Sequence, residues 1–595
     1  MQTAEIDSMG ATPCPGGVAF RVWAPNAHSV AVVGTFNGWD SDRDPLEAQG
    51  DGTWFATVAG AEVGDEYKYV LTTPFGEFLR IDPYAREVTS SVGNAVVHDP
   101  TFDWQGDDFR MSPQSELVIY ELHVGTFNDP NNSDGAGEFA GVAAGLPHLQ
   151  RLGITAIQIM PVAEFAGDRS WGYNPAHIFS VETAFGGTAA FKRFVRRAHQ
   201  AGIGVILDVV YNHFGPSDLD LWQFDGWSEN SLGGIYFYND ARAATPWGDT
   251  RPDYRRSEVR QFICDNVLMW LGEYHVDGLR FDCTHLIRTV NGENDLPEGW
   301  GLLQLIHRQI AHHCPERLTI AEDLQNCEGL VHEIGEGGAG FSAQWDAAFV
   351  HPIREAVIQA QDELRSVAAV AHAICHRYAD DAFARVIYSE SHDEVANGKA
   401  RVPQDVDPAD PTGWYAQKRS TLAAALVLTA PGIPMLFQGQ EFLQGGSFCD
   451  TVPLDWDMQE TFAGIVRLYR DLIRLRLHRT GVTRGLCGQQ TEVHHANDAT
   501  KIIAFQRRDQ GGPADDVVVV ANFSRQLCED YVIGFPAPGP WRLRFNSDWQ
   551  GYSDAFQGYP STDTTAEIGD RDGLPCYGAV SIAGYSVLIF SQDES

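Results

Sequence analysis

Strand-like and helix-like stretches alternate over residues 113–482, and this alternation restricts the fold more than any other feature of the sequence. Short runs rich in Val and Ile alternate with longer amphipathic ones, which is typical of a parallel sheet covered by helices. Strands in this number, over roughly 370 residues, predict a (β/α)8 barrel with loop insertions. The expected strands are residues 118–124, 154–160, 204–210, 276–282, 318–323, 341–349, 386–393 and 433–438.

The segments on either side of residues 113–482 have a different pattern. Residues 1–112 contain short strand-like runs, such as 18–23 and 29–33, separated by turns rich in Gly, Asn and Asp. Residues 483–595 again consist of strand-like runs. We therefore expect an N-terminal β-sandwich and a C-terminal β-sandwich flanking the barrel.

The net charge limits the classes of partner. The chain has 42 Lys+Arg against 80 Asp+Glu, a formal charge of −38, which argues against nucleic acid or an anionic membrane and fits a neutral substrate.

The 10 cysteines of the chain are dispersed without a C-x-x-C pair, so neither a zinc ribbon nor a disulfide framework is indicated. Because no leader peptide follows Met1 and no long apolar run occurs, the sequence predicts a cytoplasmic protein. It gives no indication of the oligomeric state.

Three of the expected strands end at a carboxylate: Asp282, Glu322 and Asp393. Side chains alternate along a strand, so Arg280 and Asp282 share one face and Phe281 takes the other. The carboxyl ends of barrel strands meet at one face, where we expect the three carboxylates to converge. Buried charge is costly unless it is paired, so this cluster indicates chemistry rather than stability.

Clustered carboxylates without a Cys/His zinc pattern favour glycosyl chemistry. One carboxylate attacks the anomeric carbon, and another protonates the leaving oxygen and later deprotonates the incoming hydroxyl. A cation such as Arg280 keeps the attacking group ionised, while crowded negative charge raises the pKa of another member. A metal site built from the same carboxylates is the alternative.

Four blocks of the barrel, residues 208–213, 278–285, 320–323 and 391–394, resemble in order and strand placement the four motifs of the α-amylase superfamily, glycoside hydrolase family 13. The resemblance implies that Asp282 is the nucleophile, Glu322 the general acid/base and Asp393 the stabiliser of the transition state. It also implies a retaining mechanism through a covalent glycosyl-Asp282 intermediate. Residues 17–39 resemble the carbohydrate-binding sandwich of branching, debranching and trehalose-releasing members.

The same resemblance implies a set of substrate-binding residues around the carboxylates. Asp208 would organise the floor of the site, and His213 and His392 would hydrogen-bond the sugar on which Tyr173 stacks. His285 would lie on the acceptor side, or serve only as a structural hydrogen-bonded residue. The full expected set is Tyr173, Asp208, His213, Arg280, His285, His392 and Trp247.

Trp247 belongs to an aromatic-rich insertion, residues 214–254, that follows a barrel strand. Such a segment lies on the catalytic face of the barrel. We interpret it as a wall of the glucan-binding cleft, with a plainly packed subdomain as the alternative.

Residues 120–125, 391–395 and 437–442 resemble 1,4-α-glucan branching enzymes. The first hypothesis is therefore an enzyme that cleaves an α-1,4 link of an α-glucan and remakes it as an α-1,6 branch. A barrel that only binds carbohydrate is a further hypothesis, against which the three intact carboxylates count.

Other positions resemble different members of the superfamily. Residues 208–213 are closer to amylases, debranching enzymes and trehalose-releasing hydrolases, and residues 171–173 and 245–248 resemble maltooligosyltrehalose trehalohydrolases. Hydrolysis of an α-glucan therefore stays open as the alternative, and Cys283 and Thr284 are unusual for any of these groups.

No cofactor is expected to be required. Asn212 matches a calcium ligand of many amylases, whereas branching-type members usually lack that ion. Calcium near Asn212 therefore stays open, and no other metal site is expected.

Overall fold

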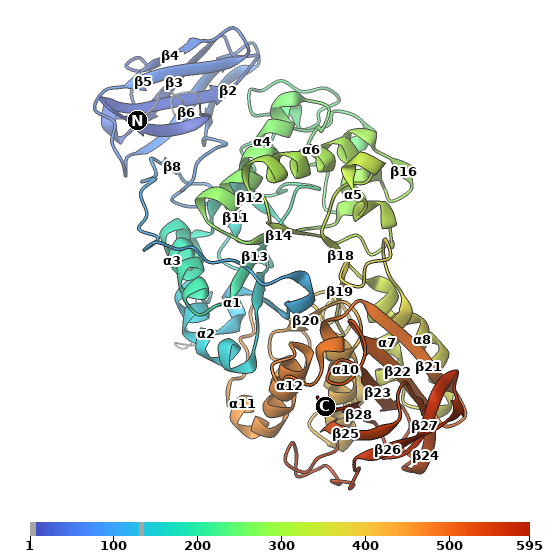
Figure 1. The fold of residues 1–595 in the computed structure, drawn as a ribbon. Coiled ribbons are helices and arrows are strands. Elements are labelled where there is room, and N and C mark those ends of the chain that lie inside the picture. Colours follow the sequence, from blue (N-terminus) through green and yellow to red (C-terminus); the bar gives the residue numbers. More distant parts are fainter. Residues whose placement is uncertain (1–7, 130–135, 595) are drawn as a thin grey trace.

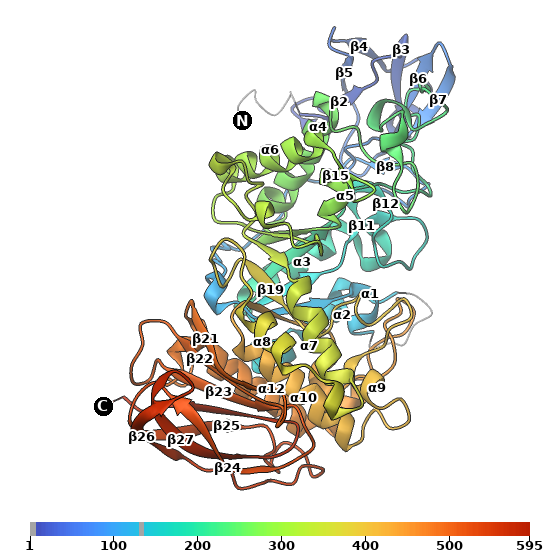
Figure 2. The same cartoon turned by 90° about the vertical axis from the view of Figure 1, so that its right-hand side faces the viewer.

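The barrel lies between two β-domains in the computed structural model, which describes residues 8–129 and 136–594. The N-terminal domain, drawn in blue, and the C-terminal domain, drawn in red, occupy opposite ends of an elongated molecule (Figures 1 and 2). The predicted architecture, a (β/α)8 barrel flanked by β-sandwiches, is confirmed.

Eight parallel strands close the barrel. Helices cover the outer face of the strands and their own side chains fill the barrel interior, so both faces are buried, the strands are near-continuous apolar runs, and every residue of Gly204–Val209 is buried. In the order in which they pair, the strands are β10 (Ala156–Ile159), β13 (Gly204–Val209), β14 (Gly278–Phe281), β17 (Leu318–Ala321), β18 (Ala343–Trp345), β19 (Arg385–Ile387), β20 (Ile433–Phe437) and β9 (Ile119–Leu122).

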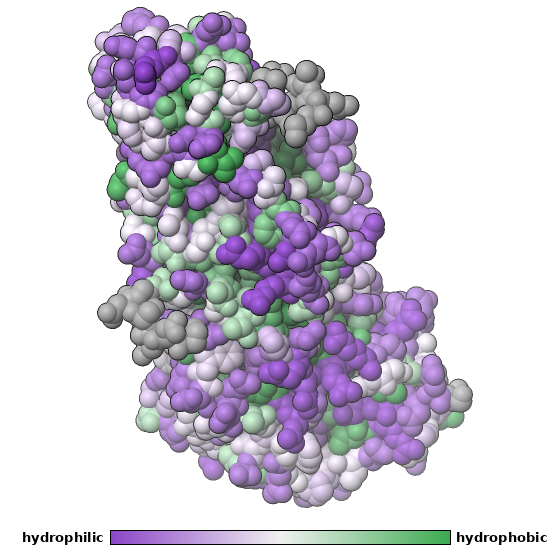
Figure 3. Space-filling view, turned by 90° about the vertical axis from the view of Figure 1, so that its left-hand side faces the viewer, coloured by the Kyte–Doolittle hydropathy of each residue, from purple (hydrophilic) through white to green (hydrophobic). Residues whose placement is uncertain are grey.

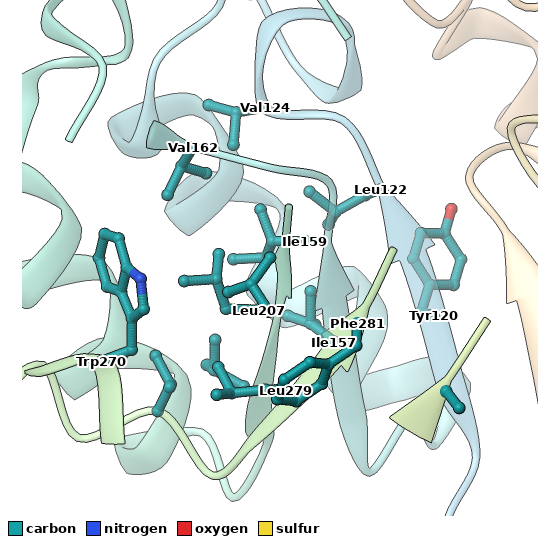
Figure 4. Packing of buried hydrophobic residues seen from close by; sticks show 14 of the residues in the cluster. Tyr120, Leu122, Val124, Ile157, Ile159, Val162, Leu207, Trp270, Leu279 and Phe281 are labelled. Atoms are coloured by element: carbon teal, nitrogen blue, oxygen red, sulfur yellow. The ribbon is translucent and has the colours of Figure 1, made fainter. Parts of the chain in front are cut away.

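Alternate side chains along these strands belong to two separate apolar clusters. Ile119, Ile206 and Ile320 pack in one cluster, which fills the barrel interior. Their neighbours along the strands pack in the outer cluster beneath the helices. Figure 4 shows part of that outer layer, where Ile157, Ile159, Leu207 and Leu279 lie near Trp270. Because side chains alternate along a strand, the second residue after each of these isoleucines also faces the interior, and it lies at the carboxyl end of the barrel.

The helices surround the strands, and their ends follow from local sequence. One helix ends at Leu152 because Gly153 takes a left-handed φ of 101°, and another begins at Pro297, whose fixed φ suits the first turn. The helices are α1 (Val124–Phe127), α2 (Phe139–Leu152), α3 (Gly187–Gln200), α4 (Ser257–Leu268), α5 (Thr284–Arg288), α6 (Pro297–His313), α7 (Ala347–Ile358), α8 (Val367–Cys375), α9 (Val402–Val406), α10 (Trp414–Thr429), α11 (Asp457–Thr461) and α12 (Ala463–Arg476).

The sixth and seventh strands are shorter than predicted. β18 ends at Trp345 rather than at residue 349, because Asp346 starts α7 by accepting a 2.9 Å hydrogen bond from the Ala348 N–H. β19 ends at Ile387, so Asp393 lies in the loop beyond the strand and not within it. This loop position leaves the side chain of Asp393 more exposed than those of the other two carboxylates.

The N-terminal domain holds the aromatic insertion in place. Arg80 donates hydrogen bonds to the carbonyl oxygens of Gln223 (2.9 Å) and Phe224 (2.8 Å), and Asn26 donates to Asp225. Its strands are β1 (Gly10–Cys14), β2 (Gly17–Trp23), β3 (Ser29–Gly34), β4 (Pro45–Ala48), β5 (Thr53–Val58), β6 (Glu66–Thr73), β7 (Gly76–Arg80) and β8 (Ala95–Val96). Two hairpins, β11 (Ala163–Phe165) with β12 (Pro175–Val181) and β15 (Thr289–Val290) with β16 (Asn294–Asp295), extend the barrel loops.

The C-terminal domain packs against α10, where Lys418 makes a buried 2.7 Å ion pair with Asp548. Its strands are β21 (Gln490–Asn497), β22 (Ile502–Arg508), β23 (Val517–Asn522), β24 (Cys528–Phe535), β25 (Gly539–Asn546), β26 (Thr564–Arg571), β27 (Leu574–Ile582) and β28 (Ser586–Ser591).

Polar side chains cover much of the molecular surface. The face in Figure 3 is largely hydrophilic, with hydrophobic side chains in small patches. Within residues 8–129 and 136–594, no helix is long and apolar enough to cross a membrane.

Candidate active site

Arg280 occupies the centre of the floor at the carboxyl end of the barrel. Its side chain is fully buried, and Nη1 donates to Asp208 Oδ2 at 2.6 Å, to Asp282 Oδ1 at 2.9 Å and to the Tyr173 hydroxyl at 3.3 Å. Its Nη2 lies 3.6 Å from Glu322 Oε2, and its guanidinium stacks on Trp345. One cation therefore joins residues from three neighbouring strands.

Asp282 is held by donors on both of its oxygens. Arg280 donates to Oδ1, and the Asn212 amide donates to Oδ2 at 2.8 Å. Hydrogen bonds from a cation and from an amide fix the orientation of the carboxylate at the floor of the site. Asp282 is thus placed to act as a nucleophile.

Glu322 has the opposite electrostatic environment although it shares the same floor. Burial, together with the negative charges of Asp282 and Asp393, raises the pKa of Glu322 to about 8, against the lowering effect of Arg280. Its Oε2 accepts a 2.6 Å hydrogen bond from the backbone N–H of Cys283, which has a left-handed φ of 47°. Below about pH 8 Glu322 therefore carries a proton that it can donate.

Asp393 lies at the rim of the site, and 43% of its side chain is exposed. The ring Nε2 of His392 lies 3.3 Å from Asp393 Oδ2, and the ring Nδ1 donates to Glu121 Oε1 at 2.8 Å. Burial disfavours the charged ring, but Asp393 and Glu121 outweigh it and raise the pKa of His392 to about 9. His392 is therefore a cation at neutral pH.

His213 lies near Asp282 in a different environment. Its Nδ1 contacts the amide oxygen of Asn212, and its Nε2, although buried, has no hydrogen-bond partner among the described residues. Burial lowers the pKa of His213 to about 4, so the ring is neutral at pH 7. The half-exposed indole of Trp247 stacks on this ring at 4.5 Å.

The remaining expected residues differ in how closely they approach the carboxylates. Tyr173 donates to Asp208 at 2.6 Å and stacks on His392 at 5.2 Å. Burial raises the pKa of Asp208 to about 7, although Arg280 lowers it. The ring of His285 contacts the Cys283 thiol at 3.5 Å rather than any of the three carboxylates.

The surroundings of Asn212 do not suit calcium. Its amide nitrogen is directed at Asp282 and its amide oxygen at His213, so the side chain is fully engaged without an ion. Calcium requires a shell of six to eight oxygen ligands. Among residues 8–129 and 136–594, no group of three or more His, Cys, Asp or Glu side chains could hold a metal.

Sequence reasoning missed two residues of this site: Glu121 pairs with His392, and Trp345 supports Arg280. It named Asn212 but not its hydrogen bond to Asp282. The alternation Ile119-Tyr120-Glu121 could have indicated Glu121, because it places the carboxylate on the interior face. No local signal reveals the contacts of Trp345, which depend on neighbouring strands.

A barrel with these carboxylates at the carboxyl ends of its strands, flanked by β-sandwiches, defines a glycoside-hydrolase type of enzyme. Residues 122–227 and 220–461 match the family described as "Alpha amylase, catalytic domain". Residues 8–85 match "Carbohydrate-binding module 48 (Isoamylase N-terminal domain)" and residues 493–593 match "Alpha amylase, C-terminal all-beta domain". The chain belongs to the α-amylase family, glycoside hydrolase family 13, and is an enzyme of that family.

Similar proteins cover most of the chain. The 1,4-alpha-glucan branching enzyme GlgB of Pseudoalteromonas atlantica is 30% identical over 93% of this chain and 78% of its own length. The enzyme of the same name from Oceanobacillus iheyensis is 30% identical over 89% of this chain and 86% of its own length. Pullulanase type I from Bacillus subtilis, solved with maltose, is 23% identical with a TM-score of 0.77, over 99% of this chain and 85% of its own; this likeness supports the fold alone.

Proposed function

We propose that the chain is a retaining 1,4-α-glucan branching enzyme in which Asp282 is the nucleophile, Glu322 the general acid/base and Asp393 the transition-state stabiliser. The observation that carries the roles is the difference between Asp282 and Glu322. Arg280 and Asn212 donate hydrogen bonds to the two oxygens of Asp282, whereas burial and negative neighbours keep Glu322 protonated below about pH 8. A carboxylate held by donors beside a carboxylic acid that can give up a proton is what a retaining double displacement requires.

In the first step the Asp282 carboxylate attacks the anomeric carbon of an α-1,4-linked glucose. The glycosidic C–O bond breaks, and the Glu322 proton passes to the leaving 4-oxygen. Asp393 stabilises the positive charge that develops on the sugar ring. The products are a glycosyl-Asp282 ester and a shortened glucan.

In the second step the ionised Glu322 takes a proton from a 6-hydroxyl of an acceptor glucan. That oxygen attacks the anomeric carbon and displaces Asp282, so an α-1,6 branch forms with retained configuration. The Cys283 N–H bond to Glu322 stabilises its carboxylate in this half of the cycle. The branching relatives over most of the chain support the 6-hydroxyl, rather than water, as the acceptor.

The proposed partner is an α-glucan such as glycogen, amylose or a maltooligosaccharide. The 80 acidic residues against 42 basic ones count against nucleic acid and anionic membranes. We place the enzyme in the cytoplasm, with no cofactor required for the reaction.

Incubation with amylose tests the acceptor. A branching enzyme lowers iodine staining with little gain in reducing ends, and a debranching enzyme then releases new short chains from the product. Reducing ends that rise from the start would instead identify a hydrolase, and free trehalose from a trehalose-capped maltooligosaccharide would identify a trehalose-releasing one.

Replacing the nucleophile tests the proposed mechanism. Asp282→Asn should lower kcat by about 10⁴-fold or more, because no other group can form the glycosyl ester. Initial rates of iodine-stain loss on amylose measure the effect. The control Asp265→Asn changes a carboxylate of α4 that hydrogen-bonds Tyr84 and Gln261, away from the site, and should retain turnover. Substantial activity in Asp282→Asn would overturn the nucleophile assignment.

A further inference from the structure

Glu121 is a buried carboxylate at the active site that the proposed reaction steps do not use. It lies on β9, its residue is 0% exposed, and it follows Ile119 on the interior face of the barrel. An ionised group in this position is costly unless its partners compensate it. Its partners therefore indicate why it is there.

Both oxygens of Glu121 are directed at His392. Oε1 accepts from the ring Nδ1–H at 2.8 Å, and Oε2 accepts from the backbone N–H of the same residue at 3.0 Å. The Gln158 amide adds a longer donor to Oε1 at 3.3 Å. The carboxylate therefore fixes the position of His392 twice, at its backbone and at its ring.

The ring of His392 is oriented by these contacts toward the reacting groups. With Nδ1 bound to Glu121, its Nε2 lies 3.3 Å from Asp393 Oδ2. Aromatic side chains surround the ring: Tyr173 stacks on it at 5.2 Å, and Trp171 and Trp345 lie at 5.8 and 6.0 Å. The faces of aromatic rings favour a cation at this position.

We propose that Glu121 is a positioning residue: it holds His392 as a cation whose Nε2–H is directed at Asp393 and at the sugar bound beside it. The inference rests on the proposed function only in treating Asp282, Glu322 and Asp393 as the reacting groups. With its ring fixed in this way, His392 holds Nε2 3.3 Å from Asp393 Oδ2 and so keeps that carboxylate in place to stabilise the positive charge on the sugar ring.

The charges that face His392 come from several elements. Glu121 from β9 and Asp393 from the same loop favour the imidazolium, and Arg280 from β14 disfavours it. His123, beyond β9, is held neutral because burial lowers its pKa to about 4. Of the groups that favour the charge, Glu121 is the one bonded directly to the ring.

The test uses the pH dependence of kcat/KM for amylose cleavage, measured by loss of iodine staining. In the wild type we expect an alkaline limb near pH 8, where Glu322 loses its proton. Glu121→Gln preserves the shape but removes the charge, so the pKa of His392 should fall from about 9 by one to three, because an adjacent opposite charge shifts a pKa by that amount. The alkaline limb should then lie below that of the wild type, because His392 loses its charge at or before the pH at which Glu322 loses its proton. Glu121→Met, which also removes the ring acceptor, should lower kcat across the whole pH range.

Two further variants separate this role from a purely structural one. If Glu121 acts through His392, Glu121→Gln should leave the pH profile of His392→Gln unchanged. Glu441→Gln is the matched control, because Glu441 is a buried carboxylate bonded to the His148 ring at 2.7 Å, outside the group of reacting residues. It should leave the alkaline limb in place. A wild-type profile in Glu121→Gln, or a further shift in the double variant, would overturn the proposal.

A measurement on the wild-type protein covers the case in which Glu121→Gln fails to fold. NMR titration of ¹³C-labelled histidines, with His392 assigned by difference from His392→Gln, should show His392 still protonated at pH 8. Titration near the ordinary histidine value of about 6.5 would overturn the proposal. Neither the pH profile nor the histidine titration depends on whether water or a 6-hydroxyl is the acceptor. If the amylose incubation identifies a hydrolase, the two measurements therefore still test the role of Glu121.

Discussion

Two histidines flank the active-site floor, and they differ in charge. His392 is paired with the Glu121 carboxylate and is a cation at neutral pH, whereas His213 is paired with the Asn212 amide and is neutral. Both rings are buried, so burial alone does not explain the difference. The neighbouring carboxylates decide it, because Asp393 and Glu121 outweigh the desolvation of the His392 imidazolium, whereas the amide oxygen at Nδ1 of His213 does not outweigh burial.

The difference gives the two sides of the site distinct tasks. The cationic ring of His392 lies beside Asp393, whose negative charge the proposed transition state needs. The neutral ring of His213 offers an Nε2 without a partner, suited to hydrogen-bonding a sugar hydroxyl, under the open face of Trp247. His392 thus contributes a positive charge to the site, and His213 contributes an uncharged ring that can bind a sugar hydroxyl.

Arg280→Lys is expected to have the largest effect of the next three variants, since Arg280 supports the floor between the two histidines. An ammonium group cannot reach Asp208, Asp282 and Glu322 together, so Asp282 loses a donor and Glu322 loses its cation. We expect kcat on amylose to fall about 100- to 1000-fold. Arg317→Lys, which keeps a cation near Asp277 away from the site, is the control and should change kcat little. Near-normal turnover in Arg280→Lys would contradict the central role of this cation.

Asn212→Asp should make the His213 side resemble the His392 side. A carboxylate at position 212 should raise the pKa of His213 by about one to three from its value of about 4. Activity should fall as well, because Asp282 loses its amide donor and gains a negative neighbour. Histidine NMR titration, with His213 assigned by difference from His213→Gln, measures the shift. An unchanged titration would show that the Nδ1 partner does not set the charge of this ring.

Trp247→Ala is expected to have the smallest effect, since the indole contributes only an aromatic surface above His213. An aromatic contact contributes about 0.5 to 1.5 kcal/mol, so KM for a short maltooligosaccharide should rise roughly 2- to 12-fold with little change in kcat. Trp549→Ala removes another half-exposed indole, in the C-terminal domain, and is the matched control for KM. A large loss of kcat would instead place Trp247 among the reacting groups.

The sequence predicted the fold and the face shared by Arg280 and Asp282, because both follow short-range rules. Apolar runs that alternate with amphipathic ones indicated the barrel, and the spacing of Arg280 and Asp282 indicated a shared face, which their 2.9 Å contact bears out. The wrong bound of the sixth strand is also local: Asp346 caps a helix inside an apolar run, so the run does not form one continuous strand.

The amino-acid sequence by itself determined which groups stand at the strand ends, because a period of two fixes the face of each side chain. Only the tertiary structure decided their charge states, because pKa values depend on burial and on partners from other strands. Burial, with Asp282 and Asp393, raises the pKa of Glu322; Asp393 and Glu121 raise that of His392 against its burial; and Asn212 is a partner of Asp282. Apart from the adjacent pair His392 and Asp393, these groups lie far apart in the chain, and no local pattern specifies their contacts.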